Sequence, residues 1–425
     1  MKVGFRKIFA SSVGSFLELY DFFLYAFLAP SLSKIFFPLN DPSALMYTYL
    51  IFAMTYLARP LGGLFFGYFV DKFSRKKVLV IAIGIMGIST TLIGLIPTFN
   101  RIGWWAPTIL LILRFIQGFS VGGDYIESLV YLIEHGEKGG RGKLGCYINM
   151  AASLGILVAP LIVYLSKIIF PGNLWWSIGW RTPFYFGFLA AISGIYIRLK
   201  LGESPQFAKL LKENKLSQNP IKEFFSNAKV LLLKCFVFST YIGVSLYVVL
   251  IFLNTWYIHF EHMPLETALL ISIVTLICNI FGTYIGGVSS DYFGRKKILY
   301  FTSISIIILT IPIFLLIEKL LIPQGYLFWI IVVQSLLLLI HGMIAGVLPA
   351  TLSELLPARI RGSGFAFSYN LALGIFGGTA PIFCLWMLKK NNSLIGPAAY
   401  VTITALFALA ITFTLKETAK SELQA

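Results

Sequence analysis

Charged side chains inside otherwise apolar stretches are the residues of this sequence best suited to chemistry. Glu18 and Asp21 lie in the first such stretch, Arg59 in the second and Arg114 in the fourth. A charge within a bilayer is costly, so a residue of this kind is a functional candidate with a partner to be found. A carboxyl group can bind and release a proton, and an arginine can bind a carboxylate through two parallel hydrogen bonds.

The spacing of the first of these groups places them on one helix face. At about 100° per residue, Glu18, Asp21 and Tyr25 fall within a sector of roughly 60°. A rise of ~1.5 Å per residue puts both acids near the middle of the bilayer and Arg59 about 20 Å from the outer end of its helix. Two interpretations stay open together: the charges pair and hold the fold, or an acid carries a proton while an arginine binds a substrate.

The fourth apolar stretch repeats this pattern. Arg114, Gln117, Asp124 and Ser128 share one face within roughly 80°, and Glu127 lies to its side. The acids of the two stretches are our candidates for proton coupling: Glu18, Asp21, Asp124 and Glu127.

In the second half of the chain, the polar residues within apolar stretches are mostly uncharged. His341 can titrate near neutral pH, although a single histidine in a span is more often a hydrogen-bonded structural residue. The candidates for substrate binding over the whole chain are Tyr25, Arg59, Arg114, Gln117, His341, Tyr369 and Asn370.

The elements that must position these residues are membrane-spanning helices. The 425-residue chain is 58% hydrophobic and only 12% charged, against the usual ~25% charged. Apolar runs of about twenty residues match the thickness of a bilayer core. We predict an all-α protein with twelve spans, near residues 9–37, 46–70, 78–97, 106–135, 144–170, 180–199, 230–258, 266–290, 298–319, 325–349, 363–388 and 396–416.

The formal charge of +16 has a topological explanation. Its basic residues gather in alternate short loops, as the positive-inside rule requires, which predicts a multi-pass protein of the bacterial cytoplasmic (inner) membrane with both termini in the cytoplasm. Nucleic-acid binding is therefore not expected. The four cysteines are scattered without disulfide or metal-site spacing, so we expect no metal.

A short basic loop occurs twice, 220 residues apart: GYFVDKFSRKK at 67–77 and GVSSDYFGRKK at 287–297. Such a constant offset indicates a duplicated half. An acid at one helix end and a cation in the next turn can bond in one conformation and part in another. We predict a cytoplasmic gate, with topological anchoring as the alternative. Its residues, with their repeats, are Asp71, Arg75, Glu134 and Arg141, and Asp291, Arg295, Glu354 and Arg361.

The duplication predicts two six-helix halves, residues 1–199 and 230–425, joined by a cytoplasmic linker over 200–229. This is the arrangement of the major facilitator fold, which places a substrate path between the halves near mid-bilayer. Glycines four apart, such as Gly282 and Gly286, allow close helix packing.

Several stretches resemble the metabolite:proton symporter family of the major facilitator superfamily over nearly the whole chain. They are GSFLELYDFFLYAFLAP (14–30), ARPLGGLFFGYFVDKFSRKK (58–77), RFIQGFSVGGDYIESLVYLIEHG (114–136), ESPQF (203–207), DYFGRKK (291–297) and SELLPARIRGSGFAFSYNLALGIFGGTAP (353–381). The closing stretch, 396–418, is most similar to the proline/betaine carriers of that family. Leu19, Asp124 and Glu127 depart from the family pattern.

The resemblance implies secondary active transport: proton-coupled symport of a small organic solute, either a proline- or betaine-like zwitterion or an organic acid, by alternating access. An efflux or exchange carrier on the same fold and a solute receptor that transports nothing are the alternatives. An enzyme is not expected, because the loops are short and show no catalytic arrangement. The expected partners are the solute, the proton and membrane lipid, with no cofactor.

Overall fold

A computed structural model of the chain describes residues 5–38, 41, 43–72, 75–120, 124–134, 136, 139–199, 229–322, 324–357 and 361–423. Helices make up nearly all of this part, and it contains no strand. The prediction of an all-α fold is confirmed. The predicted linker, up to residue 228, lies outside the described residues.

The first half contributes helices for six spans. They are α1 (Phe5–Phe36), α2 (Ala44–Lys72), α3 (Arg75–Leu95), α5 (Trp105–Ser120) followed by α6 (Asp124–Glu134), α7 (Arg141–Ile169) and α9 (Thr182–Leu199). Short helices α4 (Phe99–Ile102), α8 (Asn173–Ser177) and η1 (Gly179–Arg181) lie in its loops. The fourth predicted span is thus described as two helices on either side of residues 121–123.

The second half repeats the order. Its helices are α12 (Lys229–Leu246), η2 (Tyr247–Phe252) and α13 (Leu253–His259) in one span, α14 (Leu265–Phe293), α15 (Arg295–Leu316) with η3 (Ile317–Leu321), α16 (Leu327–Leu355), α17 (Arg361–Ala372) with η4 (Leu373–Gly377) and α18 (Ala380–Asn391), and α19 (Ile395–Phe413). Each of the twelve predicted spans falls on a helix.

Three helices contain a π-helical turn that the apolar pattern did not predict: η2, η3 and η4. A π-helical turn inserts one extra residue into a helical turn and is frequent at functional sites. Two of these turns lie close together, because a Cβ atom added to Gly377 in η4 would lie 3.3 Å from the ring of Tyr247 in η2. A larger side chain at 377 would therefore press on Tyr247.

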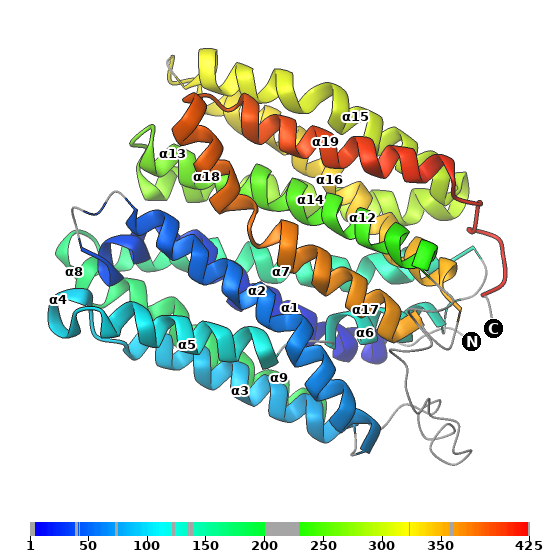
Figure 1. The fold of residues 1–425 in the computed structure, drawn as a ribbon, viewed down its shortest axis with the longest axis horizontal. Helices are drawn as coiled ribbons and strands as arrows, with labels where there is room; N and C mark the ends of the chain where they lie inside the picture. The colour runs from blue at the N-terminus through cyan, green and yellow to red at the C-terminus, as the bar shows by residue number, and fades with distance from the viewer. Residues whose placement is uncertain are drawn as a thin grey trace.

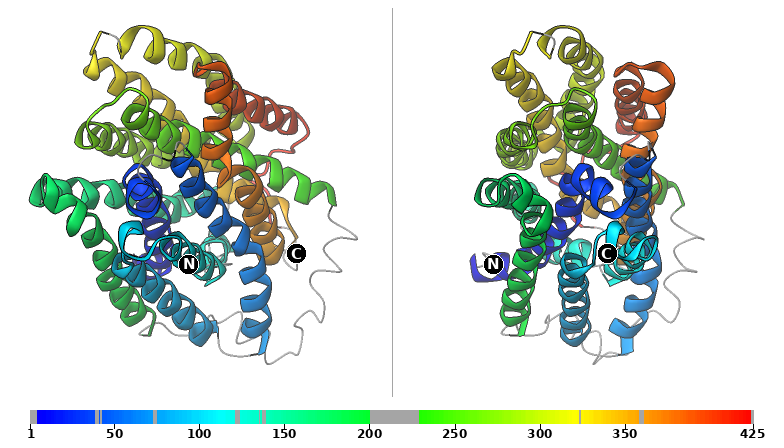
Figure 2. Two further views of the ribbon diagram at one scale, coloured as in Figure 1. Left: turned by 60° about the vertical axis from the view of Figure 1, so that its left-hand side comes forward. Right: turned by 90° about the vertical axis from the view of Figure 1, so that its left-hand side faces the viewer.

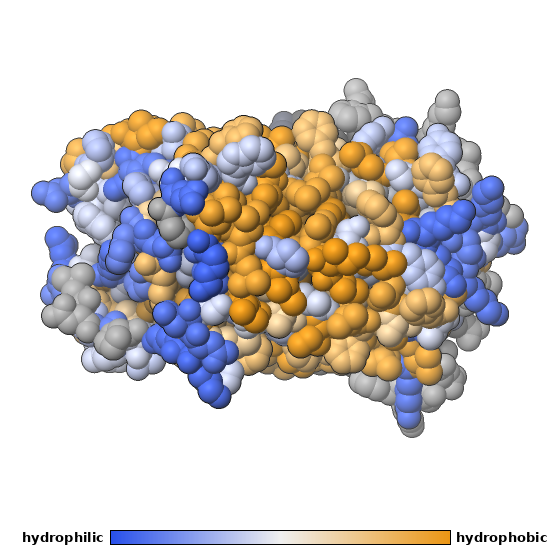
Figure 3. All heavy atoms as spheres, turned by 90° about the horizontal axis from the view of Figure 1, so that it is seen from above, coloured by the Kyte–Doolittle hydropathy of each residue, from blue (hydrophilic) through white to orange (hydrophobic). Residues whose placement is uncertain are grey.

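The two halves form helical bundles that lie side by side (Figure 1, Figure 2), and the start of α1 and the segment after α19 lie at the same end of the molecule (Figure 1). Across the boundary, α7 packs against α14 and α16, while α2 packs against α17, η4 and α18. A surface view shows an apolar band between two hydrophilic ends (Figure 3). Eight described helical segments are long and apolar enough to cross a membrane, which agrees with a bilayer around this band.

Within the second half, α14 and α16 pack backbone against backbone at glycines. Cβ atoms added to Gly282 and Gly286 would lie 2.1 Å from the carbonyl oxygens of Leu339 and Met343, and Gly346 has the same relation to Thr283. The predicted close approach at Gly282 and Gly286 is confirmed.

We predict that Gly286→Ala destabilises the protein by roughly 1–3 kcal/mol, because the added methyl group overpacks a rigid backbone contact. The measurement is thermal unfolding of the detergent-solubilised protein. Gly84→Ala is the control, because a Cβ atom at Gly84 meets nothing within 4 Å. Equal unfolding temperatures for the two variants would show that the glycine contact is not tight.

Candidate functional site

Arg59 of α2 joins both halves at the centre of the molecule. Its Nη2 lies 2.5 Å from Oε1 of Glu18 on α1, and its Nε donates to Oδ1 of Asn370 on α17 at 3.0 Å. All three side chains are buried. The guanidinium also lies 5.1 Å from the ring centre of Phe22 and 5.5 Å from that of Tyr56. One edge of Arg59 is therefore occupied by an acid of its own half and an amide of the other half.

Arg114 of α5 is joined to Asp21 of α1 by a chain of hydrogen bonds. Arg114 Nη1 donates to Gln117 Oε1, and Gln117 Nε2 donates to Thr90 Oγ1 at 2.7 Å. Thr90 Oγ1 lies 2.8 Å from Asp21 Oδ2 and 2.9 Å from the Met86 carbonyl of its own helix, so its single proton can be donated to either acceptor. The chain links three helices, with α3 supplying Thr90 in the middle. We call these four residues the Arg114–Asp21 relay.

In the described structure, some polar atoms of the relay residues have no hydrogen-bond partner. Within the described part of the chain, Arg114 Nε and Nη2 and Asp21 Oδ1 are buried without a hydrogen-bond partner. The Arg114 guanidinium instead lies over rings, 4.3 Å from the centre of Tyr25 and 5.5 Å from that of Phe22. Two adjacent donors on a buried arginine can bind a carboxylate through two parallel hydrogen bonds.

Aromatic rings fill the space between these arginines and the second half. Tyr56 and Tyr247 are hydrogen-bonded through their hydroxyl groups, and Phe23 stacks on Tyr247 with centres 5.3 Å apart. Phe52 lies 5.2 Å from Tyr56 and 5.8 Å from Tyr247, in both cases edge to face. Tyr247 is thus a ring of the second half inserted among rings of the first.

The other predicted binding residues divide into two groups. Tyr369 lies near this centre, with its ring 5.4 Å from that of Tyr125. His341 instead lies inside the second half, where Nδ1 contacts Asn279 Nδ2 at 2.8 Å and Nε2 contacts the Ile242 carbonyl at 3.1 Å. Both ring nitrogens of His341 have a hydrogen-bonding partner, which agrees with the alternative that His341 is a structural residue.

Four predicted residues are placed only by their backbone. Asp71 is near the end of α2, Arg75 begins α3, and Asp124 and Glu127 lie on α6. Their side chains lie outside the described part of the structure, so their roles stay predictions.

The predicted gate residues come together as two ion pairs exchanged between the halves. Glu134 of the first half lies 2.8 Å from Arg361 of the second, and Arg141 of the first lies 3.7 Å from Glu354 of the second. Arg141 follows Glu134 in the first half, and Arg361 follows Glu354 in the second. Each acid pairs with the arginine of the other half. This crossed pairing is what a two-fold relation between duplicated halves produces.

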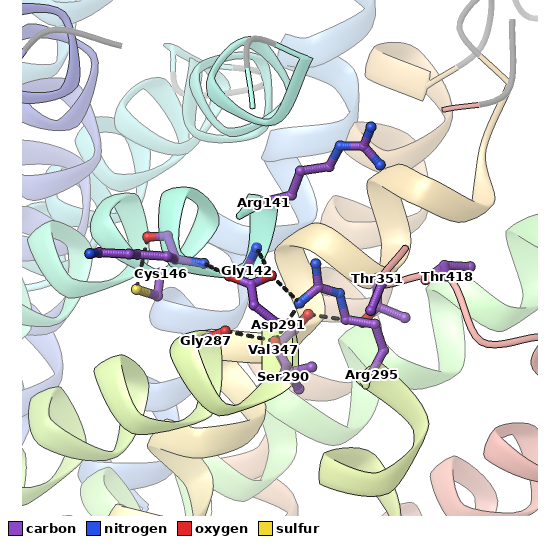
Figure 4. A network of polar contacts seen from close by, with 12 residues as sticks. Arg141, Gly142, Cys146, Gly287, Ser290, Asp291, Arg295, Val347, Thr351 and Thr418 are labelled. Atoms are coloured by element: carbon purple, nitrogen blue, oxygen red, sulfur yellow. Dashed lines mark hydrogen bonds and ion pairs between the residues drawn. The ribbon is translucent and has the colours of Figure 1, made fainter. Parts of the chain in front are cut away.

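Asp291 and Arg295 extend this cluster of ion pairs (Figure 4). The Asp291 carboxylate accepts the backbone N–H groups of Gly142 and Lys143 at 2.9 and 2.8 Å, at the N-terminus of α7. Arg295 binds Asp291 at 2.8 Å and Glu354 at 3.1 Å. An acid on a helix N-terminus is favoured by the partial positive charge there. The repeated loop thus contacts the opposite half directly.

The segment after α19 contacts this cluster of ion pairs. Thr418 Oγ1 donates to Glu354 Oε2 at 2.7 Å, and Arg141 Nη1 donates to the Ser421 carbonyl at 3.0 Å. Glu417 accepts the backbone N–H groups of Arg295 and Lys296 at the start of α15. Burial raises the pKa of Glu417, but its backbone hydrogen bonds outweigh this and hold that pKa below its usual value.

The opposite end of the molecule is also closed. Tyr49 of α2 is hydrogen-bonded to Thr255 of α13, and Lys167 of α7 lies 3.9 Å from Glu266 of α14. The halves therefore touch at both ends and at the centre.

Sequence reasoning missed Thr90, Tyr56 and Tyr247. Thr90 is an uncharged residue in an apolar stretch, and hydroxyls there commonly bond to their own helix. Tyr56 lies one helical turn before Arg59, which is a spacing that places neighbours on one face. Tyr247 is one of the uncharged polar residues within the apolar stretches of the second half, but its position in the sequence does not single it out among them.

Among the described residues, no group of three or more His, Cys, Asp or Glu side chains is arranged to hold a metal ion.

This fold, with a buried polar site between two repeated halves, is that of a membrane transporter. A model of the family described as sugar (and other) transporter matches residues 7–220 and again 208–425. The chain belongs to this family, within the major facilitator superfamily, and is not an enzyme.

The relatives and solved structures that this chain resembles are transporters too. The chain is 35% identical to the proline/betaine transporter of Escherichia coli (strain K12), over 99% of this chain and 85% of that protein. It is 32% identical to the glycine betaine/proline/ectoine/pipecolic acid transporter OusA of Dickeya dadantii (strain 3937), over 99% and 84%. Its fold is similar to the crystal structure of a D-xylose-proton symporter, with a TM-score of 0.74, 19% identity and coverage of 98% and 99%. It is also similar to a partially occluded, inward-open xylose transporter XylE from E. coli, with a TM-score of 0.77, 19% identity and 99% coverage of both chains.

We predict that Glu134→Gln loosens the gate. A hydrogen bond between charged groups contributes about 1.5–3 kcal/mol, so opening at this end should increase roughly tenfold or more. The measurement is alkylation of Cys146, which is buried against Gly287 in the contact between α7 and α14, with the modified peptide identified by mass spectrometry.

The matched control is Glu266→Gln. It removes the acid of the Lys167–Glu266 contact, which joins α7 and α14 at the opposite end of the molecule. It should not accelerate Cys146 alkylation. The charge exchange Glu134→Arg with Arg361→Glu should restore the slow rate, and a rate unchanged by Glu134→Gln would contradict the gate assignment.

Proposed function

We propose that this protein is a proton-coupled symporter for a small carboxylate-bearing solute, a zwitterion like those of its named relatives. The observation that carries the proposal is the Arg114–Asp21 relay. It joins a buried arginine with two adjacent free donors to a buried acid with a free oxygen.

In this mechanism the solute carboxylate binds Arg114 through Nε and Nη2, and Asp21 receives the proton. Removing the negative charge of Asp21 leaves Arg114 without its nearby acid, so its attraction for a solute carboxylate increases. Loading one group then favours loading the other, which is the reciprocal coupling that symport requires. Arg59 is held by Glu18 and Asn370, and its part is to tie the two halves together around the site.

The exchanged ion pairs serve as the gate on the cytoplasmic side in this proposal. Basic residues near that end, such as Lys143, Lys234 and Lys296, support this orientation through the positive-inside rule. It places the gate and both termini in the cytoplasm of a bacterial cell, with the halves 1–199 and 230–425 rocking about the central site.

The experiment is uptake by proteoliposomes under an imposed pH gradient, with proline, glycine betaine, a dicarboxylate, citrate and shikimate as labelled solutes. We expect an inward proton gradient to drive accumulation of at least one zwitterion, and a protonophore to abolish it. Accumulation that survives the protonophore would overturn proton coupling. Outward flow under the same gradient would instead identify an exchanger.

We predict that Thr90→Val uncouples transport, because valine keeps the shape of threonine but removes the hydroxyl that joins Gln117 to Asp21. Gradient-driven accumulation should fall about tenfold, the effect of one to two lost hydrogen bonds. Solute counterflow, which needs no net proton movement, should persist.

Thr91→Val is the matched control. The Thr91 hydroxyl donates to the Gly87 carbonyl of its own helix at 2.8 Å and has no place in the relay. Equal accumulation by the Thr90 and Thr91 variants would remove the relay from the mechanism.

A further inference from the structure

The two central arginines differ in what their donor edges contact. Nε and Nη2 lie on the same side of a guanidinium group and together form the pair of donors that fits a carboxylate. In Arg59 this pair is used by Asn370 and Glu18. In Arg114 the same pair is buried without a partner in the described residues. The carboxylate end of a ligand therefore belongs at Arg114.

A continuous set of rings leads from Arg114 towards the other half. Phe22 lies under both guanidinium groups, and its ring centre is 4.9 Å from that of Tyr56. Beyond it, Phe52, Tyr56 and Tyr247 form a triangle with ring centres 5.2, 5.6 and 5.8 Å apart. Their planes are inclined to one another by 65–77°, so the three rings face in different directions.

Rings arranged in this way suit a cation without hydrogen-bond donors. The face of an aromatic ring carries partial negative charge and attracts a quaternary ammonium group, which is the basis of aromatic cages. Glu18 is engaged with Arg59, and in the proposed mechanism Asp21 takes up the proton, so it carries no negative charge when the solute is bound. A positively charged solute group would therefore meet rings at this triangle.

We propose that Phe52, Tyr56 and Tyr247 form a cation subsite for the methylated ammonium group of a zwitterion whose carboxylate binds Arg114. This inference rests on the proposed function and assigns the two ends of its solute to residues. In the closed structure the three rings pack on one another, and the ammonium group enters when the halves part.

Tyr247 gives this subsite a link to the movement of the halves. It comes from η2 of the second half, whereas Phe52 and Tyr56 come from α2 of the first. A bound ammonium group touching all three rings holds the halves together through Tyr247. The absence of a side chain at Gly377 leaves room for this ring.

The test compares two ligands that differ in one atom. Glycine betaine and 3,3-dimethylbutanoate have the same shape and carboxylate, but the second has a carbon atom in place of the charged nitrogen. Calorimetric binding to the purified full-length protein, without any gradient, should favour glycine betaine by about thirtyfold, since a desolvated cation–ring contact is worth ~2 kcal/mol and each ~1.4 kcal/mol is tenfold in affinity. Equal affinities would overturn the cation subsite.

Variants test which residues bind the ammonium end and the carboxylate end of the solute. Tyr247→Leu should abolish most of the preference, Tyr247→Phe should keep it, and Tyr400→Leu, which removes a ring packed on Phe383, should leave it unchanged. Arg114→Gln should weaken both ligands at least tenfold, and unchanged affinity in that variant would overturn the carboxylate assignment. If Tyr247→Leu does not fold, the comparison of ligands on the wild-type protein still decides.

This test separates the subsite from symport. A protein that prefers glycine betaine but accumulates no solute under a proton gradient would reject symport and keep the subsite. One that accumulates another solute under the gradient and binds both ligands equally would reject the subsite and keep symport.

Discussion

The need to balance charge inside an apolar interior shapes this protein more than any other constraint. Unpaired charges within a membrane are costly, and removing one member of a buried pair is strongly destabilising. The structure satisfies Arg59 with Glu18 and Asn370, and satisfies Arg114 only in part, through Gln117. We propose that the partly satisfied arginine, Arg114, is the one that binds the solute. A site that its own protein filled completely would have no affinity left for a solute carboxylate.

The same constraint operates at the gate, where duplication supplies the partners. Glu134 and Arg141 of one half pair with Arg361 and Glu354 of the other. These two described ion pairs correspond to each other under the relation between the copies. In our proposal, closure at this end depends on hydrogen bonds and ion pairs that separate as a set, and interfaces of this kind have discrete states. The central rings and the relay lie between this gate and the contact of Tyr49 with Thr255 at the opposite end.

The sequence was sufficient to predict the class of fold and the spans, because apolar length and loop charge follow directly from bilayer physics. It also singled out Glu18, Asp21, Arg59 and Arg114 as candidates, since charge in a span is rare, and the structure buries all four. It did not predict the partners. The exchange of pairs at the gate needs the relation between halves, and Thr90 and Tyr247 acquire their roles only from residues on other helices. The π-helical turn η2, which positions Tyr247, depends on tertiary packing that an apolar pattern does not encode.

The most direct test of the central claim, that a buried acid takes up a proton with each solute, is the charge moved by transport. A zwitterion carries no net charge, so symport with a proton moves one positive charge per solute, whereas uniport moves none. In electrical recordings from proteoliposomes on a solid-supported membrane, with equal pH on both sides, glycine betaine should evoke an inward positive current. That current should be absent in Asp21→Asn vesicles that still perform counterflow. Solute uptake without current in the wild-type protein would contradict the account.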